Sequence, residues 1–285
     1  MNDPQLTVAP VESSEFRYTD ADFRRISRHV YECAGISMTP AKRSLVYGRL
    51  ARRLRLLGLT RFSDYLDRLE ADPASDEWEH FVNALTTNLT YFFRESYHFE
   101  SLAQQMCSMR ERFRIWCAAA STGEEPYSLA ITACETRGAS DARVEIVASD
   151  IDTRVLAQAE RGVYKAEQIE KLSYERRRDF FLRGKGENDG FVKVRPVIRS
   201  MIEFKQINLL DNVYRLEGKY HAIFCRNVLI YFDSETQQKV LRTIAKYLAP
   251  TGRLYIGHSE NLRALSDLYA PRGRAIYGLI HERDR

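Results

Sequence analysis

The pattern of apolar and polar residues changes along the chain. Residues 16–80 show helical patterns that no strand-like alternation interrupts. Capping residues and a helix-opening proline predict where these helices lie: Thr19 or Asp20 to Cys33, a second from Thr39–Pro40, and a third from Ser63. From Phe113 onward short apolar strands alternate with helices. We therefore expect a small all-helical domain followed by an α/β domain whose mostly parallel sheet is covered on both faces.

The first strand of the α/β part runs into a turn that could hold a ligand. Ile115–Cys117 suit a buried strand, and residues 118–123 are small and leave room beside the backbone. Glu125 follows on the next helix and can reach back toward the turn. The turn lacks the G-x-G-x-x-G spacing that brings amides against a pyrophosphate, so a dinucleotide is a poor fit. Taken alone, such a turn also agrees with plain packing.

Two further strands end in polar residues. Val144–Ala148 leads to Asp150, and Tyr220–Cys225 is followed by Asn227 and Tyr231. Ligands of open α/β sheets bind at the carboxyl ends of strands, and an acid after the second strand commonly holds a ribose. The combination predicts a site for a nucleoside cofactor.

A small antiparallel insertion is expected at about residues 163–205. Residues 191–195 alternate as a strand does, and Ile202–Phe204 are expected to pair nearby. Such an insertion has an exposed edge strand, to which a partner peptide could add by backbone pairing. Lys193 and Arg195 equally allow an edge that is simply blunted by charge.

The carboxyl-terminal part predicts one more crossover and a final strand. Its expected elements are a helix over Ser234–Leu248, a turn over 249–252, and strands over Arg253–Gly257 and Ala275–Ile280. His258, Ser259 and Glu260 follow a strand but are contiguous, and no G-x-S-x-G motif exists, which argues against a nucleophilic triad.

Positive charge gathers in the second predicted helix. Arg49, Arg52, Arg53 and Arg55 surround an apolar stripe of Val46, Leu50, Leu54 and Leu57. The cluster is either a solvated helix face or a docking surface for an acidic partner.

Composition narrows the class of protein. The 285 residues are 44% hydrophobic and 29% charged, the balance of a globular protein with a substantial core. The formal charge of +4 does not demand nucleic acid, and no apolar run approaches the roughly 18 residues of a membrane span. Five scattered cysteines suit a reducing cytoplasm, and no Cys or His spacing suggests a metal. Residues 1–15 show no secretory pattern and are expected to form a disordered tail.

Six blocks of sequence together resemble one family. They are NALTTNLTYFFRE (83–95), AAASTGEEPYSLAI (118–131), ASDID (148–152), INLLD (207–211), FCRNVLIYFD (224–233) and GHSENL (257–262). In this order they are similar to the chemotaxis receptor methyltransferases, the CheR family. The resemblance implies a cytoplasmic, S-adenosylmethionine-dependent enzyme that methylates glutamate side chains on the cytoplasmic helical domain of bacterial chemoreceptors, without a metal, nucleic acid or membrane insertion.

The resemblance also assigns domains and residues. It implies a helical receptor-docking domain (16–80), a segment that contributes to the cofactor site (81–105), and a Rossmann-like methyltransferase domain (106–285) carrying the β-subdomain. Cofactor contacts then fall on Asn88, Thr90, Arg94, Glu125, Asp150, Asn208, Leu209, Asn227 and Val228. Arg94 and Tyr231 border the methyl group in similar proteins. The subdomain resembles those that tether a carboxyl-terminal receptor pentapeptide, which implicates Gly184, Gly186, Gly190, Val192 and Val194.

Two other classes of protein remain as alternatives. A nucleic-acid methyltransferase would explain the pocket and the arginines, but an N-P-P-Y type signature is absent. A non-catalytic receptor adaptor would show damaged cofactor residues, whereas Glu125, Asp150 and Asn227 are intact.

Overall fold

The computed structural model describes residues 15–109, 111–138 and 143–280, which form two compact units. The first unit extends to Tyr31 and from Met38 to Leu85, and the second comprises Glu32–Ser37 and the chain from Thr86 onward. The predicted tail, residues 1–15, lies outside the described residues apart from Glu15.

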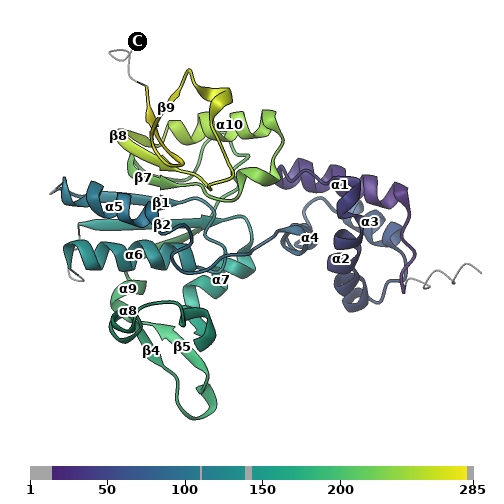
Figure 1. The fold of residues 1–285 in the computed structure, drawn as a ribbon. Coiled ribbons are helices and arrows are strands. Elements are labelled where there is room, and N and C mark those ends of the chain that lie inside the picture. The colour runs from purple at the N-terminus through teal and green to yellow at the C-terminus, as the bar shows by residue number, and fades with distance from the viewer. Residues whose placement is uncertain (1–14, 110, 139–142, 281–285) are drawn as a thin grey trace, which may run out of the picture. The chain divides into compact units, whose positions relative to one another are not determined.

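The first unit is helical, as predicted (Figure 1). Its helices are α1 (Asp20–Ala34), α2 (Arg43–Leu57), α3 (Phe62–Ala71) and α4 (Glu77–Leu85), with a short 3-10 turn at Pro40–Lys42. The apolar pattern does not predict α4, because nine residues are too few to show a clear helical period. On α2, Val46, Leu50 and Leu54 are buried. Burial of each of these side chains stabilises the unit by about 1.5–3 kcal/mol.

A seven-stranded sheet forms the centre of the second unit and confirms the predicted fold class. Its order is β6-β2-β1-β7-β8-β10-β9, and β10 is the strand that runs antiparallel to both of its neighbours. The strands are β1 (Phe113–Cys117), β2 (Val144–Asp150), β6 (Ile202–Gln206), β7 (Tyr220–Phe224), β8 (Leu248–Tyr255), β9 (Tyr269–Gly273) and β10 (Ile276–Leu279). Because β2, β1 and β7 are parallel neighbours, their carboxyl ends lie at one edge.

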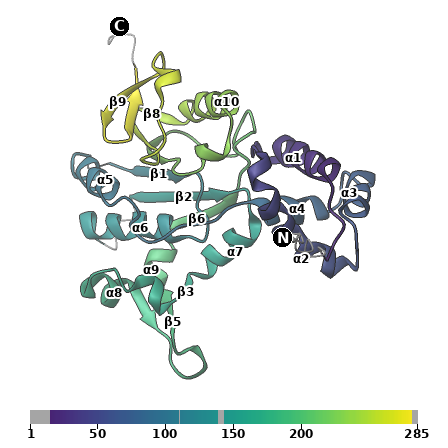
Figure 2. The same cartoon turned by 45° about the vertical axis from the view of Figure 1, so that its right-hand side comes forward.

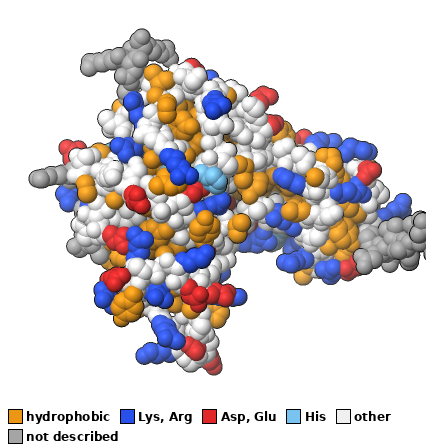
Figure 3. All heavy atoms as spheres, viewed as in Figure 1, with side chains coloured by type: hydrophobic (Ala, Val, Ile, Leu, Met, Phe, Trp, Pro, Cys, Tyr) orange, Lys and Arg blue, Asp and Glu red, His pale blue; other side chains and the backbone are white. Residues whose placement is uncertain are grey.

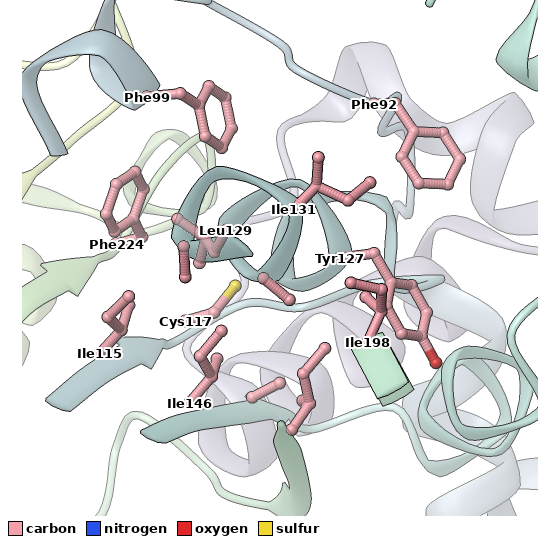
Figure 4. Packing of buried hydrophobic residues seen from close by; sticks show 14 of the residues in the cluster. Phe92, Phe99, Ile115, Cys117, Tyr127, Leu129, Ile131, Ile146, Ile198 and Phe224 are labelled. Atoms are coloured by element: carbon pink, nitrogen blue, oxygen red, sulfur yellow. The ribbon is translucent and has the colours of Figure 1, made fainter. Parts of the chain in front are cut away.

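Alternation along the strands divides the core into two layers. Ile115, Cys117 and Ile146 point into the layer under α5 (Tyr97–Cys107) and α6 (Glu124–Arg137), as Figure 4 shows for the side chains around α6. Trp116 and Ile223 point into the opposite layer, which contains the buried side chains of α10 (Ser234–Ala245). Since both faces are covered, these strands are apolar at almost every position.

The predicted insertion is a separate three-stranded antiparallel sheet, seen below the main sheet in Figures 1 and 2. Its strands are β3 (Val163–Lys165), β4 (Phe181–Arg183) and β5 (Phe191–Val194), in the order β3-β5-β4. It follows α7 (Thr153–Arg161), includes α8 (Tyr174–Phe180) and leads through a short helix α9 (Pro196–Arg199) back to β6.

Two expectations about this insertion are wrong. Ile202–Phe204 do not pair within it, because β6 lies beside β2 in the main sheet, in parallel register. The strand that carries Lys193 is not an edge strand either, since β5 pairs with β3 on one side and with β4 on the other. Short alternating strands do not reveal their neighbours, and here the edges fall to β3 and β4.

A third expectation, the turn over residues 249–252, is also corrected. β8 runs through these residues, but its register against β7 slips from Tyr220↔Leu248 to Ala222↔Arg253. A Cβ at Gly252 would lie 2.9 Å from the carbonyl oxygen of Tyr220, so only glycine lets the slipped strand approach this closely. Turn-forming residues therefore mark a bulge inside the strand.

Candidate functional site

The structure brings together the three strand ends that the sequence singles out. The amide of Ala118, after β1, donates to the Phe224 carbonyl of β7 at 2.8 Å. The amide of Ala120 donates to the Ser149 carbonyl of β2, also at 2.8 Å. The small-residue turn is thus pinned between the ends of its two neighbouring strands.

Asp150 faces this turn from the end of β2. Its carboxylate accepts hydrogen bonds from the amides of Ser121, at 2.8 Å, and Asp152, at 3.0 Å. Burial raises the pKa of Asp150 against these two donors. Gly123 closes the turn with φ at 100°, and a Cβ there would lie 2.7 Å from the Tyr164 hydroxyl oxygen, so the position requires glycine.

Glu125 takes part in a buried ion pair. Its Oε2 lies 2.5 Å from Nη1 of Arg226, and its Oε1 accepts a hydrogen bond from the Cys117 thiol at 3.3 Å. Burial raises the pKa of Glu125, while the charge of Arg226 acts in the opposite direction. The Arg226 side chain has no exposed surface. Arg226, which precedes Asn227 in the chain, is therefore a structural cation.

Glu95 is a site residue that the sequence does not single out beyond its place in the first family block. Its carboxylate lies 3.0 Å from Nδ1 of His258, 3.3 Å from Nη2 of Arg226, and 3.4 Å from the side-chain nitrogen Nδ2 of Asn227. Burial alone would raise the pKa of Glu95, but the hydrogen bond from His258 and the charge of Arg226 lower it to about 2. Glu95 therefore stays ionised and connects three separate loops.

The segment before Glu95 lies against the small-residue turn. Thr86 and Asn88 donate side-chain hydrogen bonds to Oδ2 of Asp152, at 2.7 and 3.0 Å. Ser121 in the turn donates to the carbonyl of Asn88 at 3.0 Å. Asn88, a residue expected at the cofactor, therefore lies beside the turn, and Thr90, two residues further on, is half-buried.

Arg94 and Tyr231, expected near the methyl group, lie on loops of the same unit. Arg94 donates from Nη1 to the Leu89 carbonyl at 3.1 Å, and its own carbonyl accepts from Arg226 at 2.5 Å. Tyr231 ends a short 3-10 turn that begins at Leu229, and its side chain is half-buried.

The remaining expected cofactor residues follow β6 and β7. Asn208 donates to the Cys33 carbonyl at 2.7 Å, and Leu209 is buried. The amide of Asn227 donates to Oε2 of Glu260 at 3.0 Å, and Val228 beside it is half-buried. Burial raises the pKa of Glu260, opposed by the backbone donors around it.

Backbone strain is concentrated at this edge of the sheet. Five non-glycine residues among those described have positive φ, and four of them are Phe93, Glu95, Ser121 and Asn227, at 47–58°. Each such residue costs of order 1–3 kcal/mol and persists where the surroundings hold it, which is common at ligand sites. All four belong to the loops just described.

The four arginines expected to dock a partner differ in their surroundings. Arg53 forms a bidentate pair with Glu77, at 2.6 and 2.5 Å, and Arg49 donates to the Leu85 carbonyl at 2.7 Å. Arg55 is exposed and pairs with Glu15. Arg52 is exposed, and its side chain forms no hydrogen bond or ion pair within the described part of the chain.

The residues expected to tether a peptide lie around the β4–β5 connection. Gly186 and Gly190 have φ of 60° and 82°, and a Cβ at Gly184 would overlap the Asn188 carbonyl oxygen, so all three need glycine. Val192 and Val194 point into the core from the central strand β5. Their backbone is already paired on both sides, so an added strand would have to use the outer edge of β4 or β3.

Three general findings concern the described residues only. No helix among them is long and apolar enough to cross a membrane. Within the same ranges no cluster of His, Cys, Asp and Glu side chains could hold a metal ion. All five cysteines lie in those ranges and are free thiols.

Comparison with known proteins covers almost the whole described chain. The model of the CheR methyltransferase SAM-binding domain matches residues 88–275, and that of the CheR methyltransferase all-α domain matches residues 21–86. The chain is 48% identical to a chemotaxis protein methyltransferase of Escherichia coli K12, over 92% of this chain and 91% of the relative. It is 47% identical to the corresponding protein of Salmonella typhimurium LT2 (98% and 97% covered) and to chemotaxis protein methyltransferase 2 of Pseudomonas aeruginosa (96% and 99%).

Proposed function

This chain belongs to the CheR methyltransferase family, and from that membership and the geometry of its site we propose that it is a protein-glutamate O-methyltransferase. It would transfer a methyl group from S-adenosylmethionine to glutamate side chains of bacterial chemoreceptors, leaving glutamate methyl esters and S-adenosylhomocysteine. The relatives are chemotaxis protein methyltransferases, which supports a role for this chain in chemotaxis.

The observation that carries the proposal is the charge balance at the edge of the sheet. Asp150, Glu125 and Glu95 bring three carboxyl groups to these loops, and Arg226 is the buried cation that pairs with two of them. Such an excess of acid suits a ligand that carries positive charge and hydroxyl groups. S-adenosylmethionine has both, so the residues fit it: Asp150 would hold its ribose hydroxyls and Glu125 would face its amine.

The chemistry needs little from the protein beyond placement. A glutamate side chain has a pKa near 4.3 and is already a carboxylate at neutral pH, so no general base is required. The bound cofactor supplies a methyl group on a sulfonium, whose bond to carbon breaks as the carboxylate oxygen attacks. The tasks left to the chain are alignment and exclusion of water. Arg94 and Tyr231 would steer the incoming carboxylate.

One experiment tests this function against its rivals. The protein is incubated with S-adenosylmethionine labelled on the methyl group and with either a chemoreceptor cytoplasmic fragment or nucleic acid. We expect label on the fragment, released as methanol by mild alkali because the product is an ester. Alkali-stable label, label on nucleic acid, or fragment binding without any label would each contradict the proposal.

The partner surfaces remain proposals as well. Arginine side chains of α2 would meet the acidic substrate helix, with Arg52 the member free to do so. A receptor tail pentapeptide would add to the outer edge of β4 next to Gly184 and raise the local concentration of substrate sites. Calorimetric titration with the pentapeptide tests the tether, using as control the same peptide with alternate backbone amides methylated. Equal binding of both peptides, or of neither, would exclude strand addition.

A further inference from the structure

Two basic side chains outside the proposed cofactor contacts lie beside Glu95. The His258 ring is bonded to Glu95 through Nδ1, and its side chain is 58% exposed. The Arg274 guanidinium lies 4.6 Å from the centre of the Tyr97 ring, and the Tyr97 hydroxyl donates to Oε2 of Glu95 at 3.2 Å. Arg94 immediately precedes Glu95 in the chain. His258 thus contacts Glu95 directly, and Arg274 contacts it through Tyr97. We call Arg94, His258 and Arg274 the cationic rim.

The backbone holds this rim in place. The Ile256 amide, two residues before His258, donates at 3.1 Å to the carbonyl of Ala275, the residue after Arg274. Ala275 is the fifth non-glycine residue of positive φ among those described, at 54°. The segments that carry His258 and Arg274 are therefore hydrogen-bonded neighbours, and strained backbone occurs here as it does around the cofactor edge.

The charge of the rim is largely uncompensated. Glu95 is the one carboxylate in the described part of the chain to which a rim side chain bonds, and it is shared with the buried Arg226. Arg274 is exposed, and Nε2 on the other side of the His258 ring forms no hydrogen bond with another described residue. Figure 3 shows exposed basic side chains, in blue, spread over the face viewed in Figure 1, with an exposed histidine, in pale blue, among them. The two arginines of the rim, Arg94 and Arg274, beside an exposed imidazole, favour an anionic partner.

Apolar side chains adjoin the rim. Leu89 is 78% exposed, and its carbonyl accepts from Arg94; Tyr91 is 53% exposed, with the Arg94 guanidinium 5.7 Å from its ring centre. Ile230 is 51% exposed, and its amide lies 3.3 Å from Glu260, two residues after His258. Large exposed apolar residues next to cations suit an amphipathic helix with an acidic face better than a nucleic acid, whose phosphates offer no apolar side.

We infer that the cationic rim and the apolar residues beside it form a second docking surface, on the methyltransferase unit itself, for the acidic amphipathic helix that carries the target glutamate. The inference rests on the proposed function and adds to it. Arg274, together with His258 when its ring carries both protons, would bind substrate carboxylates other than the one that is methylated. They would thereby select for targets that lie among further acidic residues.

The test compares His258→Gln, Arg274→Gln and the double variant with wild type. A matched control is Arg161→Gln, which also removes one exposed charge from this unit but lies at the far end of α7, roughly 13 Å from that helix's start at the cofactor edge. Methylation of a chemoreceptor cytoplasmic fragment gives KM and kcat, and calorimetry gives the affinity for S-adenosylmethionine. Fluorescence anisotropy measures binding of the fragment without turnover.

The double variant is expected to raise the KM for the fragment about tenfold and to weaken fragment binding equally, with a smaller dependence on salt. The kcat and cofactor affinity of Arg274→Gln, which leaves the His258–Glu95 contact intact, should stay within about twofold of wild type, which also shows that this variant is folded. Arg274→Lys, which keeps the charge, should recover most of the loss. A KM for the double variant equal to that of Arg161→Gln, or Arg274→Lys as impaired as Arg274→Gln, would overturn the inference.

Failure of the proposed function gives a different result. If wild type binds the fragment but does not label it, the enzymatic proposal is wrong, while weaker binding by the double variant still supports the docking surface. If a DNA oligomer inhibits wild type more strongly than it inhibits the double variant, the rim takes phosphates and the assignment to an acidic helix is wrong.

Discussion

At the scale of single residues, the site depends on Arg226. This fully buried guanidinium pairs with Glu125 and Glu95 and donates to the Arg94 carbonyl. A buried ion network is weak evidence for net stability, but removal of the Arg226 guanidinium leaves Glu125 buried without its ion-pair partner. Arg226 is therefore the residue whose loss should damage the unit most.

Arg226→Met should lower the free energy of unfolding by about 3–5 kcal/mol, measured by urea denaturation. Arg242→Met is the control, because Arg242 forms an exposed pair with Asp267 and its loss should cost at most about 1 kcal/mol. If both variants lose the same small amount, the buried network does not hold these loops.

His98 predicts how stability depends on pH. Burial first, and then the nearby charge of Arg226, lower its pKa from 6.5 to about 4. The folded protein favours neutral His98, whereas the unfolded chain protonates this side chain below about pH 6.5. The free energy of unfolding that depends on His98 is therefore highest above pH 6.5 and falls as pH drops toward 4. The linked change is about 3 kcal/mol. His98→Gln should flatten this part of the pH–stability curve, whereas His80→Gln, at an exposed position, should leave it unchanged.

Cofactor affinity provides a third residue-scale prediction. Asp150→Asn and Glu125→Gln should each weaken S-adenosylmethionine binding about tenfold or more, because each removes a charge-assisted contact in a buried setting. Calorimetry measures the affinity, and Asp267→Asn, at an exposed position, is the control. Unchanged affinity in both site variants would remove these carboxyl groups from the cofactor site.

At the scale of elements, helix α2 combines structural and available arginines. Arg53 is bound to Glu77, whose carboxylate also accepts from the Tyr65 hydroxyl at 2.9 Å. Arg52 is exposed on the same helix. A cluster that looks uniform in sequence therefore divides into residues that hold α4 and residues that can meet a partner.

Charge reversal should separate these two roles. Arg52→Glu is expected to slow methylation of a receptor fragment several-fold with a change in unfolding free energy within about 0.5 kcal/mol. Arg53→Glu should destabilise the unit by about 2 kcal/mol or more, because it places a carboxylate against Glu77. Arg68→Glu, an exposed change on α3, is the control for loss of charge. If Arg52→Glu and Arg68→Glu methylate at the same rate, Arg52 does not dock the substrate.

Regular elements were predictable because their signals are local. The helix over 153–161 and the strands that begin at Val144 and Tyr220 follow from capping and from apolar runs. The neighbours of β5 and β6 did not follow, because a four- or five-residue strand fits several partners. Glu95 was not singled out from residue patterns, since the Asn227 and His258 side chains that it contacts lie 132 and 163 positions away in sequence.

At the scale of the whole molecule, the chain pairs a modest net charge of +4 with basic side chains gathered on a few surfaces. Association with an acidic receptor should therefore depend on ionic strength more than catalysis does. Raising salt from about 0.05 to 0.3 M should lower kcat/KM for the receptor fragment several-fold while kcat at saturation changes little. A fall in kcat with constant KM would show that salt acts on the chemical step instead.

The hydroxyl of Tyr164 on β3 donates to the Thr122 carbonyl at 2.7 Å, and Gln168 donates to Glu124 at 3.2 Å. The small sheet is thus fastened to the loop that is proposed to cradle the nucleoside. A deletion that joins Arg161 directly to Ile202 would remove the small sheet and, with it, the contacts that support that loop from outside. Chimaeras that exchange the small sheet between relatives therefore need to keep the Tyr164 and Gln168 contacts, or the loop proposed to hold the nucleoside loses its outer support.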